Sequence, residues 1–172
     1  IAEITPLTDT SLDFLELRHR RRDSAFQQFV QTAHERRALK HPELVGSQLA
    51  RRERLGTTAF GRGFAVTGVW SLCVRTPLLL LGVSERGLEW DAPDEGAVHL
   101  AACVFTPGEC SEDLHLRRVN AVVAALRLQR TRQDSSTSAR AEVRPVARAV
   151  VKPANFARVM PPAPIIVLPA TI

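Results

Sequence analysis

The sequence of 172 residues has few lysines, few cysteines and no long apolar run. No run approaches the roughly 18 apolar residues that a membrane-spanning helix needs, and no signal peptide is visible. Cys73, Cys103 and Cys110 are odd in number and lack the spacing of metal ligands, which disfavours a zinc site or a disulfide framework. We therefore expect free thiols, no metal or cofactor, and a cytoplasmic domain that is either free or peripheral on the cytoplasmic side of a membrane complex.

Lysine occurs only at positions 40 and 152, so arginine carries almost all of the net charge of +5. Guanidinium groups pair well with carboxylates and phosphates, although a GC-rich genome would also favour arginine codons. Nucleic-acid binding is disfavoured because neither interleaved aromatic residues nor a known motif accompanies the basic residues. The densest basic cluster is either a solvated loop or a contact for an acidic protein partner, and it comprises Arg18, Arg20, Arg21 and Arg22.

A hydrophobic content of 45% in a chain of this length predicts one core with extensions. Apolar patterning predicts strands over residues 14–18, 69–75, 78–83 and 98–105, and helices over residues 23–38, 42–55 and 111–126. These elements predict an α/β fold, in which a central mixed sheet of about four to six strands has helices on both faces. We expect the globular domain to cover residues 1–151 and an extended tail to cover residues 152–172.

Local signals add detail to the three predicted helices. Asp23 is a good N-cap for the first, Pro42 suits the first turn of the second, and Ser111 caps the third. Residues 127–140 read as a polar loop, and a last helix is expected over residues 139–151. The apolar faces are predicted from helical spacing. They comprise Phe26, Phe29, Val30 and Ala33 in the first helix, Leu44, Val45 and Leu49 in the second, and Leu116, Val119, Val122, Val123 and Leu126 in the third.

The stretch over residues 51–68 reads RRERLGTTAFGRGFAVTG and organises the rest of the chain. A charged helix end leads through Gly56 into a short threonine-rich strand. Gly61 and Gly63 then permit backbone angles that other residues avoid, and an apolar strand follows. The stretch therefore predicts a helix, a strand, a tight turn and a second strand.

This stretch resembles the enzyme IIA domains of the bacterial phosphotransferase system, of the fructose, mannitol and nitrogen-regulatory type. Their motif is an Arg-Glu helix end, Gly-Ser/Thr-Thr, and then Gly-x-Gly-x-Ala-apolar-Pro-His, whose histidine accepts a phosphoryl group. The present chain has Thr67 and Gly68 in place of Pro-His. It retains the other positions as Arg52, Glu53, Gly56, Thr57, Thr58, Gly61, Gly63, Ala65 and Val66.

Two later segments extend the resemblance over almost the whole globular part. Residues 87–94 read GLEWDAPD and are similar to the family segment Asp-Phe/Trp-Asp-Ala-Pro-Asp-Gly. His115 matches the Glu-x-x-His-Leu region, where the resemblance implies a second histidine that assists the active site. Taken by itself, His115 is not a site and is better explained as a surface or turn histidine at the start of a helix.

The residue at position 68 decides the chemistry that the resemblance implies. Phosphoryl transfer between imidazoles requires a positioned ring nitrogen as nucleophile, and glycine has no side chain to supply one. The loss of proline also frees the backbone that would approach the site. We therefore expect a pseudo-enzyme, a protein-binding, structural or regulatory subunit of a larger assembly. Its degenerate site would comprise Arg52, Thr57, Thr58, Gly61, Gly63, Thr67, Gly68 and His115.

Two alternative hypotheses keep a function for the site. In the first, His115 itself accepts a phosphoryl group and the protein is a residual phosphocarrier. In the second, backbone N–H groups of residues 56–58 and 61–63, together with Arg52 and Arg62, bind phosphate or a phosphometabolite without chemistry.

The C-terminal residues 152–172 depart from the family, with five prolines and almost no charge. Proline favours extended geometry, and the apolar side chains require a surface to pack on. We expect residues 156–172 to lie extended on a neighbouring subunit, while packing against their own domain remains open. The residues expected to make this contact are Phe156, Ile165, Ile166, Val167 and Leu168.

Overall fold

The computed structural model describes residues 7–134. The predicted helix over residues 139–151 and the tail over residues 152–172 lie outside this range. The elements are, in order, β1 (Ser11–Glu16), α1 (Arg22–Glu35), α2 (Pro42–Arg54), β2 (Ala59–Gly61), β3 (Phe64–Ser71), β4 (Leu78–Leu88), β5 (Val98–Pro107) and α3 (Glu112–Asp134).

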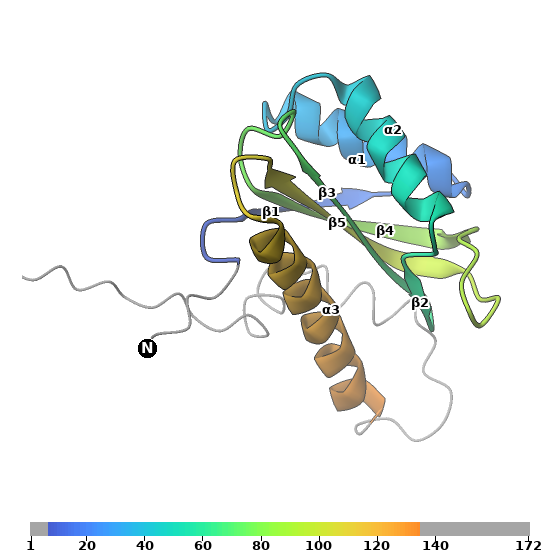
Figure 1. Cartoon of the computed structure of the whole chain (residues 1–172). Helices are drawn as coiled ribbons and strands as arrows, with labels where there is room; N and C mark the ends of the chain where they lie inside the picture. The colour runs from blue at the N-terminus through green and yellow to red at the C-terminus, as the bar shows by residue number, and fades with distance from the viewer. Residues whose placement is uncertain (1–6, 135–172) are drawn as a thin grey trace, which may run out of the picture.

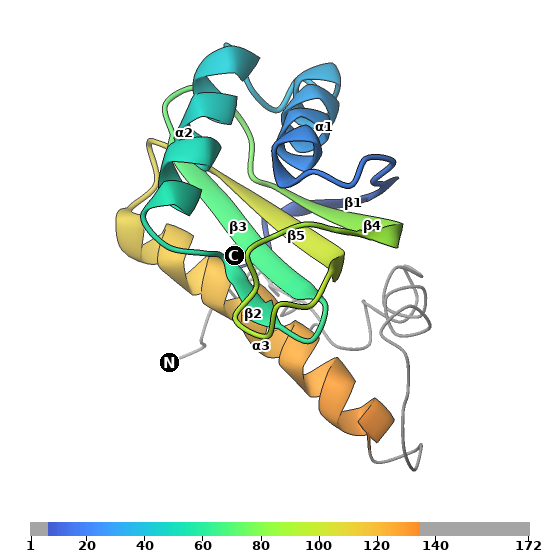
Figure 2. The ribbon, with the colours of Figure 1, turned by 90° about the vertical axis from the view of Figure 1, so that its right-hand side faces the viewer.

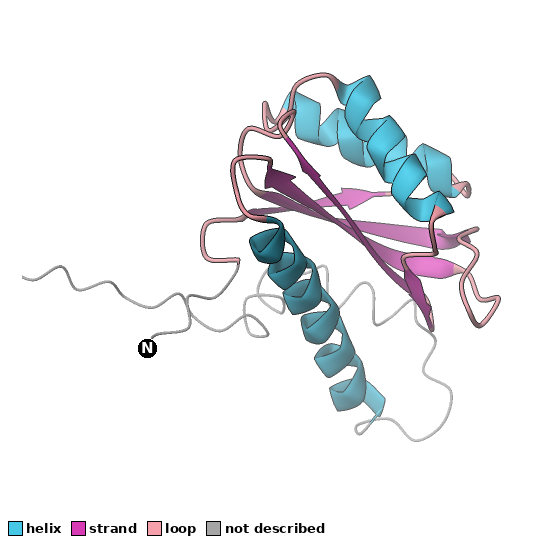
Figure 3. Ribbon diagram, in the orientation of Figure 1, coloured by secondary structure: helices cyan, strands magenta, loops and turns pink. Residues whose placement is uncertain are grey.

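The five strands form one mixed sheet in the order β1-β4-β5-β3-β2. Figure 3 shows this sheet in magenta between the helices. β1 is parallel to β4 and β3 is parallel to β5, whereas the pairs β4–β5 and β2–β3 are antiparallel. β5 is therefore the central strand. The prediction of a mixed sheet within one α/β domain is confirmed.

Helices cover both faces of the sheet, as predicted. α1 and α2 lie together on one face, and α3 crosses the opposite face (Figures 1 and 2). β5 serves both layers because its side chains alternate. Ala101, Cys103 and Phe105 belong to the cluster under α1 and α2, whereas Leu100 and Val104 belong to the cluster under α3.

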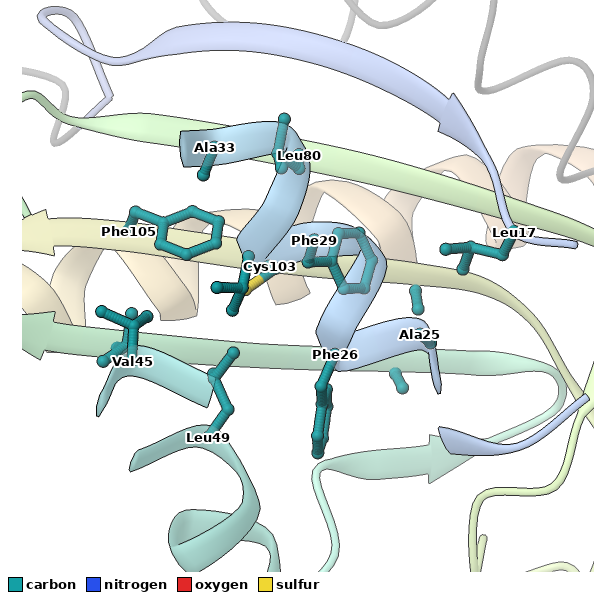
Figure 4. Packing of buried hydrophobic residues seen from close by; sticks show 14 of the residues in the cluster. Leu17, Ala25, Phe26, Phe29, Ala33, Val45, Leu49, Leu80, Cys103 and Phe105 are labelled. Atoms are coloured by element: carbon teal, nitrogen blue, oxygen red, sulfur yellow. The ribbon is translucent and has the colours of Figure 1, made fainter. Parts of the chain in front are cut away.

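The core under α1 is built around aromatic residues of that helix (Figure 4). Phe29 is fully buried, and Phe26 packs edge-on against Trp90 with the ring centroids 5.3 Å apart. Cys103 lies in the same cluster, and burial raises the pKa of its thiol, which keeps it neutral. The three cysteines are free, and Cys73 and Cys110 are both half-buried.

The first two elements begin earlier than the sequence predicted. β1 covers residues 11–16 rather than 14–18, because Leu17 turns into the core. α1 begins at Arg22, so Asp23 lies in its first turn and is not the N-cap. The N-cap is Arg21, which is held in an extended conformation by a bridge to Glu89. A tertiary contact therefore outweighs the capping preference.

Three other predictions need correction. Leu44 and Leu116 are 56% and 53% exposed, and the buried residue that completes the face of α2 is Glu53. The strand predicted over residues 69–75 is the end of β3, which stops at Ser71. The expected loop from Arg127 is helical as far as Asp134, because leucine, glutamine and arginine in this stretch are good helix formers.

Gly82 in β4 tests the packing of α1 on the sheet. A Cβ atom at this position would lie 2.6 Å from Leu17 Cδ1 and 3.0 Å from Phe29 Cζ. We expect Gly82→Ala to lower the free energy of unfolding by about 1–3 kcal/mol through overpacking. In the control Gly46→Ala, nothing lies within 4 Å and a helical glycine is removed, so stability should rise by about 1 kcal/mol in chemical denaturation.

Candidate functional site

The glycine turn of the central motif joins β2 to β3. Gly61, Arg62 and Gly63 have φ angles of 84°, 55° and 86°, so all three lie in the left-handed region. Arg62 N–H donates to Asp94 Oδ2, and Gly96 N–H donates to Asp94 Oδ1 at 3.2 Å. The hydrogen bond from Arg62 is the main cause that lowers the pKa of Asp94. The carboxylate of Asp94, from the same domain, therefore occupies the place beside the turn where an anion would bind.

Glu53 of the same motif is a buried structural residue. Its Oε1 accepts hydrogen bonds from Thr58 N–H and Trp90 Nε1, both at 3.0 Å, and its Oε2 accepts from Thr58 Oγ1 at 2.6 Å. Arg22 lies 4.0 Å from Glu53 Oε1 and 2.9 Å from Asp91 Oδ2. The carboxylate joins the end of α2, the start of β2 and the loop after β4.

The remaining polar residues of the motif are also used within the fold. Arg52 is exposed and donates from its guanidinium to Gly56 C=O at 3.0 Å. Thr57 Oγ1 accepts Ala59 N–H at 3.2 Å. Of the N–H groups predicted to bind an anion, those of Gly56, Thr58 and Arg62 therefore donate to acceptors within the domain.

Gly68 and His115, by contrast, are brought directly together. Gly68 lies in β3 on the face covered by α3, because its neighbours Phe64 and Val66 belong to the cluster on that face. A Cβ atom at position 68 would lie 2.9 Å from His115 Cε1 and 3.1 Å from Val119 Cγ2. The His115 ring therefore occupies the space that a side chain at position 68 would need.

The environment of His115 keeps its imidazole neutral. The ring is half-buried, and its Nδ1 lies 2.9 Å from Oγ1 of the buried Thr106 in β5. Burial, followed by the positive charge of Arg118, lowers the pKa of His115 below its ordinary value of 6.5. Protonation is thus easier in the unfolded chain, so the stability that His115 contributes is lost as the pH falls below 6.5 towards the folded-state pKa.

Arg118 lies one helical turn after His115 and is fully buried. Its guanidinium donates to both carboxylate oxygens of Asp9 at 2.8 Å. This pair fixes the segment before β1 against α3, and it holds a permanent positive charge behind the imidazole.

The side chain of Thr67 lies on the other face of β3 from His115. Ala65 and Val69, its alternate neighbours in β3, belong to the cluster under α1 and α2, so the Thr67 side chain points away from His115. Thr67 is 1% exposed, and its Oγ1 has no hydrogen-bond partner among the described residues.

Exposed apolar side chains surround the start of α3. Trp70 is 41% exposed, and its indole N–H donates to Cys110 C=O at 2.9 Å. Leu72 is 82% exposed and its side chain lies against Gly108, while Leu116 follows His115 directly. We call Trp70, Leu72 and Leu116 the apolar rim. The sequence analysis missed the rim because it placed Leu116 on a buried helix face and Trp70 and Leu72 in a strand.

The arginine cluster lies on another part of the surface. Arg18, Arg20 and Arg21 are exposed, whereas Arg22 is half-buried in its ion pairs with Asp91 and Glu53. Within residues 7–134, no helix is both long and apolar enough to cross a bilayer, and no group of three or more acidic, cysteine or histidine side chains is arranged to hold a metal ion.

This arrangement defines an α/β domain with a glycine turn and a histidine-containing site at the contact of β3 with α3. A family model described as "Phosphoenolpyruvate-dependent sugar phosphotransferase system, EIIA 2" matches residues 7–142. The chain belongs to this enzyme IIA family, as the sequence motif predicted.

Individual relatives agree with this assignment. The chain is 34% identical over 62 residues to the "PTS system fructose-like EIIA component" of Escherichia coli (strain K12), an alignment that covers 36% of this chain and 42% of the relative. The nitrogen regulatory protein IIA-Ntr of Neisseria meningitidis superposes with a TM-score of 0.62 at 24% identity, over 84% of this chain and 97% of that protein. The mannitol IIA protein of Escherichia coli gives 0.56 at 15% identity, over 77% and 94%.

The two buried threonines in neighbouring strands provide a matched test of the site. Thr67→Val removes a hydroxyl without a hydrogen bond, so we expect the free energy of unfolding to rise by about 1 kcal/mol. Thr106→Val removes the partner of His115 Nδ1 and should lower it by about 1–3 kcal/mol. Urea denaturation measures the free energy of unfolding of both variants. Equal changes in this free energy would contradict the assignment of the Thr106–His115 hydrogen bond.

Proposed function

We propose that this protein is a catalytically silent member of the enzyme IIA family that acts as a protein-binding subunit. It docks a partner through the apolar rim around the site and transfers no phosphoryl group. The observation that carries this proposal is the contact between Gly68 and His115. Position 68 offers no nucleophile, and the ring of His115 fills the adjoining space.

The apolar rim supplies the binding surface in this proposal. Three large apolar side chains that are 41–82% exposed lie in α3 or against the turn that precedes it, and such groups stabilise complexes when a partner removes them from water. The mannitol IIA protein was solved in complex with phosphorylated IIB, so one structural neighbour binds a protein partner. By analogy, we infer that this chain binds a protein within a larger, regulatory or structural assembly.

Arg18, Arg20 and Arg21 provide a second contact in the proposal. Their exposed guanidinium groups suit an acidic protein surface, and they steer association more than they strengthen it. Such an assembly is cytoplasmic or lies peripherally on the cytoplasmic side of a membrane.

A second candidate function is phosphoryl transfer through His115. One observation favours it. The neutral imidazole of His115, whose Nδ1 is hydrogen-bonded to Thr106, lies beside position 68, where by resemblance the family has its phosphoryl acceptor. The N–H groups of Thr58 and Arg62, which such transfer or phosphate sensing would use, already donate to Glu53 and Asp94. We therefore prefer the docking function over both the carrier and the anion sensor.

Site-specific photo-crosslinking tests the docking face. We expect p-benzoylphenylalanine at position 70, replacing Trp70 of the rim, to form a covalent adduct with a discrete partner in living cells. The same amino acid at position 44 replaces Leu44, which is 56% exposed on α2 at the opposite face of the sheet. It should give no adduct of that mass in gel electrophoresis and mass spectrometry.

An adduct at position 44 of equal or greater yield would place the contact on the wrong face. Adducts at neither position would remove the rim as a binding surface. A circular dichroism spectrum and melting temperature for each protein ensure that the two are compared in the folded state.

A further inference from the structure

The outer edge of β1 is an open edge of the sheet. β1 is the first strand in the sheet order, and no strand within residues 7–134 pairs with its outer side. Ser11 N–H donates to Pro77 C=O at 3.2 Å, and Leu17 N–H donates to Val83 C=O at 2.8 Å. The odd-numbered residues therefore bond towards β4. Because backbone groups alternate between the two edges of a strand, the even-numbered residues direct theirs outward.

Side chains of the domain cover only part of this edge. Phe14 N–H donates to Asp13 Oδ1 at 2.9 Å, and Glu16 C=O accepts from Gln28 Nε2 at 3.2 Å. Such capping is one way in which sheet edges are protected from pairing. It leaves the N–H and C=O of Leu12, the C=O of Phe14 and the N–H of Glu16 in position for a short additional strand.

Two of the three outward-bonding residues of this stretch, Leu12 and Phe14, have apolar side chains, and the third is the exposed Glu16. Leu12 is 37% exposed, and Phe14 is half-buried against the cluster under α3. Both point to the same face of the sheet because they are two residues apart. A strand added beside them would extend that cluster only if its own side chains were apolar.

Residues 165–168 of the tail have the composition and length that this stretch requires. Ile165, Ile166, Val167 and Leu168 carry no charge, and three of the four are β-branched, which favours a strand. Pro164 and Pro169 bound the run, and proline cannot donate to a ladder. We propose that residues 165–168 of the same chain add to the outer edge of β1 as a sixth strand.

The length of the chain favours an occupant from the same molecule over one from a second copy. Ile165 is 31 positions after Asp134, and an extended chain of that length spans up to about 100 Å. α3, with 23 residues, is about 35 Å long, so the tail reaches any part of the domain. A tethered segment also has an effective concentration in the millimolar range, well above that of a separate molecule at working dilution.

Amide hydrogen exchange in the full-length protein tests this proposal residue by residue. We expect the amides of Leu12 and Glu16, followed by NMR, to exchange slowly in the wild-type protein because the tail pairs with them. The double variant Ile166→Pro/Val167→Pro removes whichever of the two N–H groups faces β1. It should raise both exchange rates at least about tenfold.

The double variant Ala163→Pro/Ala170→Pro is the matched control, because it adds two prolines outside the run and should leave both rates unchanged. Fast exchange of Leu12 and Glu16 in the wild-type protein would overturn the proposal. Protection that disappears on tenfold dilution, together with a dimeric mass in light scattering, would also overturn it, because the occupant would then be a second copy.

Discussion

The buried carboxylate of Glu53 is the interaction on which the middle of this structure depends. It accepts three hydrogen bonds, from Thr58 and Trp90, and it lies near Arg22 at the start of α1. One carboxylate therefore joins three segments that are distant in the sequence, namely the start of α1, the connection from α2 to β2, and the loop after β4. A buried carboxylate persists only when its oxygens are satisfied, so these segments must be positioned together.

The motif shared with the enzyme IIA family therefore has two separable parts. Glu53, Thr58 and Asp94 hold the frame of the site through hydrogen bonds within the domain. Position 68 is where, by resemblance, the family places its chemistry. The glycine at this position lets α3 approach β3 closely and offers no side chain, and the hydrogen bonds of the frame do not involve it. The fold therefore does not depend on a side chain at position 68.

The sequence predicted the architecture well because apolar patterning and the family motif are local signals. Errors arose where tertiary contacts decide the outcome. The contact of Arg21 with Glu89 sets the start of α1. The buried face of α2 comprises Val45, Leu49 and Glu53, so Leu44 lies outside it. The residues that shape the site most, Thr106, Arg118 and Asp9, carry no motif of their own. Their roles depend on contacts between residues up to 109 positions apart.

The most direct test of the account is phosphoryl transfer to the full-length chain. The purified protein is incubated with labelled phosphoenolpyruvate and the general phosphotransferase proteins, with an active enzyme IIA domain as the positive control. We expect the control to gain acid-labile phosphate and this chain to gain none. Stoichiometric acid-labile label on this chain that is lost in His115→Ala would contradict the account and establish His115 as the acceptor.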